Sequence, residues 1–228
     1  EVIPFLWQDG ALQSTLIVSP PGKGKTTMLR DCIRQISNGT LIHPGMTVGL
    51  VDERSEIAGC SGGIPGNDVG IRTDVLDACP KAKGLLIRSM APEVVAADEI
   101  GSQEDLEAFT YAMRCGCVLF ATVHGSSFRE LLEKPVLKDL VRERLFSRYI
   151  VLKNGELPGQ VEVIVNEEGR DFAEDHGMES DFGGRLRIRG CSSQRTGKES
   201  CTAGRAAAAV IDPPGGDPLC EAYVASGL

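Results

Sequence analysis

The sequence lacks the features of membrane-spanning, exported and strongly basic proteins. Its longest apolar runs, such as residues 117–123, are far too short to cross a bilayer, and no charged segment followed by an apolar one opens the chain. Lys and Arg total 24 against 32 Asp and Glu, which gives a formal charge of −8. A chain of this charge has no overall attraction for nucleic acid or anionic lipid. We therefore expect a soluble, unexported protein that does not bind nucleic acid.

The sequence also lacks the C-x-x-C pairs that mark many zinc and redox sites. Eight cysteines are present, and the one close pair, Cys115 and Cys117, flanks Gly116 where a buried strand is expected to begin. Two interpretations stay open: small buried thiols in a reducing compartment, or a metal or redox role. The spacing favours the buried thiols.

The composition is that of a folded domain followed by a tail. Of the 228 residues, 42% are hydrophobic and 25% are charged, which excludes fibrous and wholly disordered chains. Strand and helix patterns alternate over residues 1–170 and give way to Gly, Pro and Ala segments over 171–228. We predict a folded domain over the first range and a largely unstructured tail over the second. The tail contains one weak helical pattern, at residues 203–211. The abrupt change in sequence pattern near residue 170 also fits a tail that is an out-of-frame extension of the true gene product. Because the chain begins at Glu1 rather than Met, we expect it to be a fragment.

Six apolar runs predict strands, and helical patterns lie between them. The predicted strands are 15–18, 47–51, 93–97, 118–123, 149–153 and 161–165, and the predicted helices are 26–36 and 102–115. Ser102 and Asp105 form a capping box that opens the second helix, and Gly116 ends it. Asn154-Gly155 predicts a turn between the last two strands. The alternation predicts an α/β three-layer sandwich with a mostly parallel sheet, which binds ligands at the carboxyl ends of its strands.

The strongest chemical signal is a glycine-containing loop between the first strand and the first helix. It fits the phosphate-loop pattern G-x-x-x-x-G-K-[ST], except that Ser19 replaces the first glycine. In such a loop the backbone N–H groups surround phosphate oxygens, and the helix N-terminus adds a favourable field. The alternative is a surface turn without function. We predict that the loop binds ATP through Pro20, Pro21, Gly22, Lys23, Gly24, Lys25, Thr26 and Thr27. Lys25 would reach the β- and γ-phosphates, and the Thr26 hydroxyl would bind Mg²⁺.

A second signal is the pair of carboxylates that ends the strand predicted at 93–97. Asp98 is expected to hold Mg²⁺ through water, and Glu99 is expected to polarise the water that attacks the γ-phosphate. In isolation, a solvent-facing acidic turn is the better interpretation. The position after a phosphate loop favours the functional one and predicts a P-loop NTPase that hydrolyses ATP.

Two further groups are expected at the same edge of the sheet. His124 follows the strand predicted at 118–123 and is either a structural histidine or a residue that senses the γ-phosphate or orients water. The run 52–56 has two interpretations. It is either a solvated charged surface, or its residues Glu53, Arg54 and Glu56 contact the nucleotide or a neighbouring subunit.

Several segments together resemble one family. These are SPPGKGKTTMLRD (19–31), VDERSEIAG (51–59), NDVGIRTDVLD (67–77), RSMAPEVV (88–95), DEIG (98–101) and TVHG (122–125). Over residues 1–167 the chain resembles the stage III sporulation protein AA family of endospore-forming bacteria. Members of that family are similar to the RecA-like, AAA-type motor ATPases of type II and type IV secretion systems.

The resemblance implies a cytoplasmic ATPase of the mother cell, hexameric when full-length, at the base of the channel to the forespore. It implies membrane proteins of the same sporulation operon as partners, and contact with the membrane only through them. By the resemblance, 52–56 matches the acidic-box region and His124 the histidine-box region. Family members carry a further N-terminal region that supplies arginines to a neighbouring subunit. We therefore expect this chain alone to be a weak ATPase, with Arg54, Arg72 and Arg142 as candidates in trans.

Two other functions stay open at this point. One is a RecA-like ATPase acting on nucleic acid, which the charge of −8 argues against. The other is an ATP-binding structural anchor with little turnover.

Overall fold

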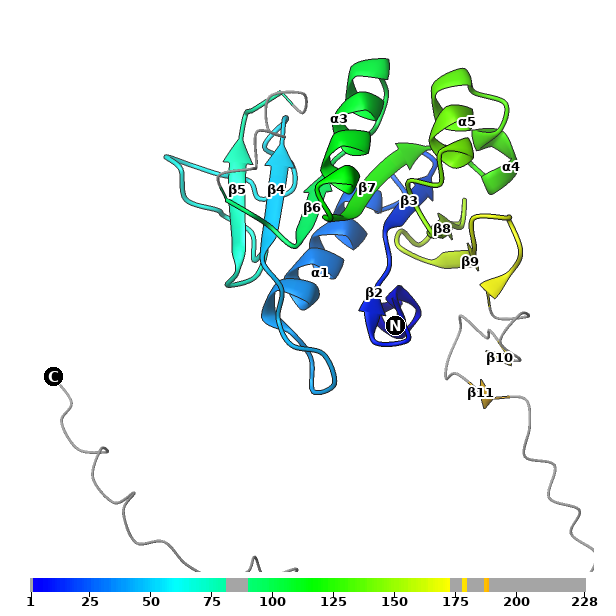
Figure 1. Cartoon of the computed structure of the whole chain (residues 1–228), viewed down its shortest axis with the longest axis horizontal. Helices are drawn as coiled ribbons and strands as arrows, with labels where there is room; N and C mark the ends of the chain where they lie inside the picture. Colours follow the sequence, from blue (N-terminus) through cyan, green and yellow to red (C-terminus); the bar gives the residue numbers. More distant parts are fainter. Residues whose placement is uncertain (1, 81–89, 173–177, 180–186, 189–228) are drawn as a thin grey trace, which may run out of the picture. The chain divides into compact units, whose positions relative to one another are not determined.

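The computed structural model describes residues 2–80, 90–172, 178–179 and 187–188 (Figure 1). The chain divides into units of residues 1–191 and 192–228, and every described residue belongs to the first. The helical stretch predicted at 203–211 and most of the predicted tail lie outside the described residues.

A seven-stranded sheet forms the centre of the fold. Its order is β5 (Thr73–Asp77), β4 (Val48–Asp52), β6 (Val94–Ala97), β7 (Val118–His124), β3 (Thr15–Ser19), β8 (Arg148–Leu152) and β9 (Val161–Val165). All neighbours pair in parallel except β8 and β9, which are antiparallel. Every residue of β3, β4, β6 and β8 is buried, because helices cover both faces of a parallel sheet.

The helices form the two outer layers (Figure 1). Helix α1 (Lys25–Asn38) packs on one face, and α3 (Gln103–Arg114), α4 (Phe128–Leu131) and α5 (Pro135–Arg142) pack on the other. Alternate residues of β3 show the division: Ile17 belongs to the core that holds α1, whereas Leu16 and Val18 belong to the core that holds the other three helices. The predicted α/β three-layer fold with a mostly parallel sheet is confirmed.

The first residues fold onto the sheet beside α1. They form a 3₁₀ helix, η1 (Ile3–Leu6), and a small hairpin of β1 (Trp7–Gln8) and β2 (Ala11–Leu12). Buried Arg148 holds this segment, since its Nε donates to the Phe5 carbonyl at 3.3 Å and its guanidinium lies 4.2 Å from the centre of the Phe172 ring. The Phe5 and Phe172 rings meet edge to face at 6.1 Å. The folded core therefore includes Phe172, two residues beyond the boundary expected at 170.

The sequence patterns located most elements but omitted several. The capping box of Ser102 and Asp105 is present, and Gly116 follows α3 with φ +88°. Edge strand β5, the short helices α4 and α5, and the N-terminal hairpin were not predicted. Within residues 171–228, where a largely unstructured tail was predicted, β10 (Met178–Glu179) pairs with β11 (Arg187–Ile188).

The cysteines are less buried than predicted. Cys32 is buried, but Cys60, Cys79 and Cys117 are half-buried and Cys115 is exposed. Cys191, Cys201 and Cys220 lie outside the described residues. Within the part of the chain that the structure describes, no group of three or more His, Cys, Asp or Glu residues could hold a metal ion. Among the same residues, no helix is both long and apolar enough to cross a membrane.

Candidate functional site

The glycine-containing loop connects β3 to α1 at the carboxyl edge of the sheet. Ser19 is the last residue of β3 and is buried, so a side chain is tolerated where the phosphate-loop pattern has glycine. Gly22 and Gly24 have φ values of +72° and +89°, a backbone region that strains other residues. Gly24 caps α1 without a side-chain hydrogen bond. The first N–H groups of α1 and the positive end of its dipole therefore face the loop, an arrangement suited to anions.

Three predicted site residues meet behind this loop. The Lys25 ammonium lies 3.3 Å from Oε2 of Glu99 and 3.1 Å from Nε2 of His124, and the latter two atoms are also 3.1 Å apart. The Lys25 side chain is only 11% exposed, whereas those of Glu99 and His124 are 26% and 38% exposed. A cation fixed beside a partly open carboxylate and an imidazole is an arrangement that can bind a phosphate and accept a proton from water.

The strand order creates this meeting point. Strand β7 lies between β3 and β6, and Ser19 is paired in register with His124. Ala97, the last residue of β6, is paired with Ala121, so Asp98 and Glu99 continue toward the same edge. The three strands therefore end side by side, and their terminal side chains come together. His124 was predicted to follow this strand, and in the structure it is the last residue of β7.

Asp98 is nearly buried behind this group, at 6% exposure. The Thr122 hydroxyl on β7 donates to its Oδ1 at 2.9 Å and so fixes the orientation of the carboxylate. Mg²⁺ prefers oxygen ligands and is usually held by one or two protein groups together with phosphates and water. The Thr26 hydroxyl in the first turn of α1 and the Asp98 carboxylate are donors of this kind, so the residues present fit a magnesium ion.

The backbone after His124 is held by a network of polar contacts. Lys134 donates to the His124 carbonyl at 2.9 Å and pairs with Glu130 at 2.8 Å. Glu130 also accepts the backbone N–H and the hydroxyl of Ser126 at 2.6 and 2.7 Å. The hydrogen bond to Lys134 and those to Ser126 lower the pKa of Glu130 to about 2. Nδ1 of His124 is buried and has no hydrogen-bond partner within the described part of the chain.

The acidic run after β4 has a structural role at its first residue. Asp52 is fully buried, and its carboxylate accepts the backbone N–H groups of Glu56, Ile57 and Ala58 at 3.0, 3.0 and 2.8 Å. Asp52 thus folds the loop back on itself. Glu53, Arg54 and Glu56 are exposed.

The candidate arginines do not gather at the phosphate loop. Arg54 follows β4 at the carboxyl edge of the sheet. Arg72 precedes β5 at the opposite edge, where it donates to the Ser37 carbonyl near the end of α1 at 3.1 Å. Arg142 lies in the last turn of α5 and is exposed. None of the three is in contact with Lys25 or Glu99 in the structure as described.

Sequence reasoning missed three contacts that support the site, one of them made by Lys23, which was itself predicted to bind ATP. Thr122 orients Asp98, Lys134 holds the His124 carbonyl, and Lys23 contacts the connection between β8 and β9. For Thr122 a signal was present, since a polar residue in the middle of an apolar strand needs a partner. The other two contacts join segments that no local pattern relates.

A family model and a curated relative both point to one sporulation family. The family model for sporulation stage III, protein AA matches residues 1–172. Stage III sporulation protein AA of Bacillus subtilis (strain 168) is 45% identical over 181 residues, which are 78% of this chain and 59% of that protein. Protein SEEDLING PLASTID DEVELOPMENT 1 of Arabidopsis thaliana is 32% identical over 146 residues, covering 62% of this chain and 20% of that protein.

Similar solved structures include an ATPase and a pilus retraction motor. The ATPase DotB of Legionella pneumophila has a TM-score of 0.49 and 15% identity, covering 67% of this chain and 43% of that one. The pilus retraction motor PilT with bound ADP has a TM-score of 0.47 and 17% identity, covering 67% and 46%.

The chain spans about three fifths of the length of the Bacillus subtilis protein. The family model, however, covers three quarters of the chain, including the phosphate loop, the acidic pair and His124. The chain therefore belongs to the stage III sporulation protein AA family.

Proposed function

We propose that this chain binds Mg²⁺-ATP and hydrolyses it as the motor or assembly ATPase of a sporulation complex. The observation that carries the proposal is the contact of Lys25 with Glu99 and His124 directly behind a glycine-containing loop at a helix N-terminus. The same residues in an acidic surface turn would have no reason to meet a buried lysine.

The chemistry follows from the positions of these groups. The loop N–H groups and the Lys25 ammonium bind the phosphates. Glu99 is then free to accept a hydrogen bond from a water molecule in front of the γ-phosphate. Water forms a bond to phosphorus as the bond to the bridging oxygen of ADP breaks, and Glu99 takes the proton. With Nε2 protonated, His124 donates to Oε2 of Glu99 at 3.1 Å and keeps the carboxylate oriented. Mg²⁺, held by Thr26 and Asp98, would supply charge that stabilises the phosphates.

Two variants test this assignment. Lys25→Ala should abolish ATP binding in calorimetry, because the β- and γ-phosphates lose the Lys25 ammonium as their positively charged partner. Glu99→Gln should keep the affinity nearly unchanged while reducing turnover by at least ~10²-fold, the scale of losing a general base. Lys138→Ala, at an exposed position on α5, is the matched charge control. Undiminished ATP binding by Lys25→Ala would show that the loop is not a phosphate site.

We further propose that fast turnover needs an oligomer. An arginine from a neighbouring subunit can raise the rate of phosphoryl transfer by ~10³-fold or more, and Arg54, Arg72 and Arg142 are the candidates within this chain. The 228-residue chain should then be a weak ATPase whose rate per subunit rises with protein concentration. A fast rate that does not depend on concentration, measured on a monomer, would refute this.

The biological setting of the proposal rests on the family. A cytoplasmic position in the mother cell, a hexameric assembly and partners among the membrane proteins of the sporulation operon are the expected context. Comparing Glu99→Gln with the parent for turnover and for partner binding separates a motor from an anchor, because an anchor needs no general base.

A further inference from the structure

A cavity of about 600 Å³ opens beside the phosphate loop. It lies between α1 and the β8–β9 connection (residues 153–160), and this volume is within the range of ~300–1,000 Å³ typical of small-molecule sites. Its lining residues are Val2, Gly24, Thr27, Met28, Asp31, Cys32, Pro158, Gly159, Gln160 and Val161. The cavity therefore begins at two residues of the phosphate loop itself and extends away from Lys25 along the helix.

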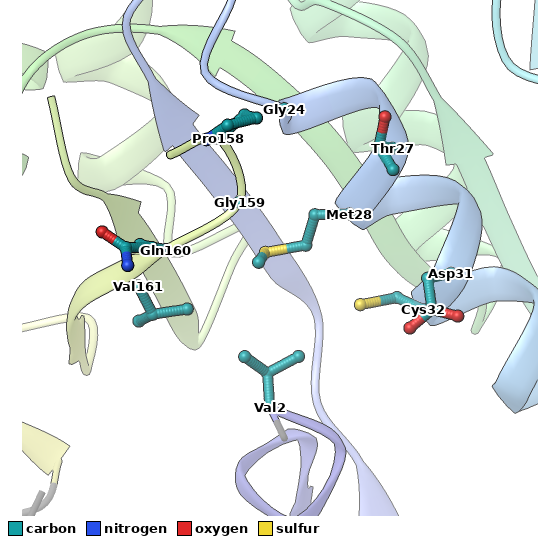
Figure 2. Close-up of a pocket in the computed structure, with 10 residues that line it drawn as sticks. All are labelled: Val2, Gly24, Thr27, Met28, Asp31, Cys32, Pro158, Gly159, Gln160 and Val161. Atoms are coloured by element: carbon teal, nitrogen blue, oxygen red, sulfur yellow. The ribbon is translucent and has the colours of Figure 1, made fainter. Parts of the chain in front are cut away.

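The lining is apolar in the middle and polar at the margins. Met28 and Cys32 reach from α1 into the space, with Val2 of the N-terminal segment opposite them and Val161 at the start of β9 (Figure 2). A methionine thioether makes favourable contacts with aromatic rings. Asp31 is already engaged, since its carboxylate accepts from Arg34 and Gln35 on the same helix. The middle of the cavity thus suits a flat, uncharged ring system and offers no cation for a second phosphate.

One wall of the cavity is tied to the phosphate loop at two points. The Lys23 ammonium donates to the Gly155 carbonyl at 2.8 Å, and the Lys23 carbonyl accepts the Gly159 N–H at 2.8 Å. A methyl group placed on Gly24 would lie 3.0 Å from the Gly159 nitrogen, so the connection sits directly against the loop. The ammonium of Lys23 is engaged with the connection and is therefore not directed at the phosphates.

We infer that this cavity binds the nucleoside part of the nucleotide, with the β8–β9 connection as its wall and Lys23 as the positioning residue that holds the wall in place. The inference rests on the proposed function. A phosphate chain held by Gly24, Lys25 and Thr26 leaves its nucleoside beside the start of α1, and the cavity adjoins that place. Lys23 thus acts on the base and ribose through the connection, whereas Lys25 acts on the phosphates.

The test compares Mg²⁺-ATP with Mg²⁺-tripolyphosphate, which carries the phosphates without a nucleoside, by calorimetry on the full chain. The parent should bind ATP at least ~10-fold more tightly than tripolyphosphate, since ~10-fold corresponds to a modest set of contacts. Lys23→Met and Met28→Ala should each weaken ATP binding by roughly 5- to 10-fold and tripolyphosphate binding by less than about 2-fold. Lys23→Arg should retain most of the ATP affinity, because it can still donate to Gly155.

The controls separate this inference from its premise. Lys138→Met makes the same substitution at an exposed position on α5 and should change neither affinity. Equal affinity of the parent for the two ligands would overturn the nucleoside site and leave the phosphate loop intact. Equal weakening of both ligands by Lys23→Met would show that Lys23 contacts phosphate rather than positioning the wall. Failure of the parent to bind either ligand would instead refute the proposed function.

Discussion

Replacing Asp52 by Asn tests whether the acidic run after β4 is structural or functional. The carboxylate is fully buried and accepts three backbone N–H groups, from Glu56, Ile57 and Ala58. Asparagine keeps one acceptor oxygen. In its better orientation this oxygen still accepts from Ile57 and Ala58, and the amide group then faces the N–H of Glu56.

The expected loss of stability follows from these contacts. Hydrogen bonds to a charged group contribute about 1.5–3 kcal/mol each, and neutral ones about half of that. Losing one such bond and halving two others gives a loss of roughly 3–6 kcal/mol in the free energy of unfolding. That is a large share of the ~5–15 kcal/mol typical of a domain.

Urea unfolding of the parent and of Asp52→Asn measures this loss. Asp77→Asn is the matched control, because Asp77 ends the neighbouring strand, is exposed, and accepts a hydrogen bond from the Ser55 hydroxyl at 2.5 Å. It should lose no more than ~1 kcal/mol. ATP affinity of folded Asp52→Asn should equal that of the parent. A loss of ATP binding without a loss of stability would refute the structural role of Asp52.

Three other predictions follow from contacts near the site. Glu130→Gln should lower the free energy of unfolding at neutral pH, and this loss relative to the parent should vanish as the pH falls from about 4.5 to about 2. The reason is that the lowered pKa of Glu130 stabilises the folded state only while the carboxylate is ionised. Urea unfolding at a series of acidic pH values measures the loss, and a loss that does not change with pH would contradict the prediction. Burial raises the pKa of Cys32 to about 12, so iodoacetamide should modify exposed Cys115 in the native protein and Cys32 only after unfolding; mass spectrometry of the peptides gives the answer. Thr122→Val should raise the Mg²⁺ concentration needed for half-maximal ATP binding several-fold, because Asp98 loses its orienting hydroxyl, and an unchanged Mg²⁺ dependence would argue against that role.

The sequence by itself determined the local parts of this protein. The loop from Ser19 to Thr27 could be recognised because its conformation depends on its own glycines and on the helix that follows. The same holds for the capping box of α3 and for the buried strands, whose apolar runs reflect burial on both faces. Strand β5 was not predicted because it is an edge strand with polar ends, and its residues are half-buried or exposed.

Only the tertiary structure decided which of these parts meet. Lys25 is 74 residues from Glu99 and 99 residues from His124, and the three come together because β7 inserts between β3 and β6. The same parallel pairing leaves Arg72 at the opposite edge of the sheet. Lys23 reaches a connection 132 residues away, which no pattern around either segment indicates. Backbone conformation is set by neighbours in the chain, whereas strand order is set by burial of the whole sheet, and the site depends on both.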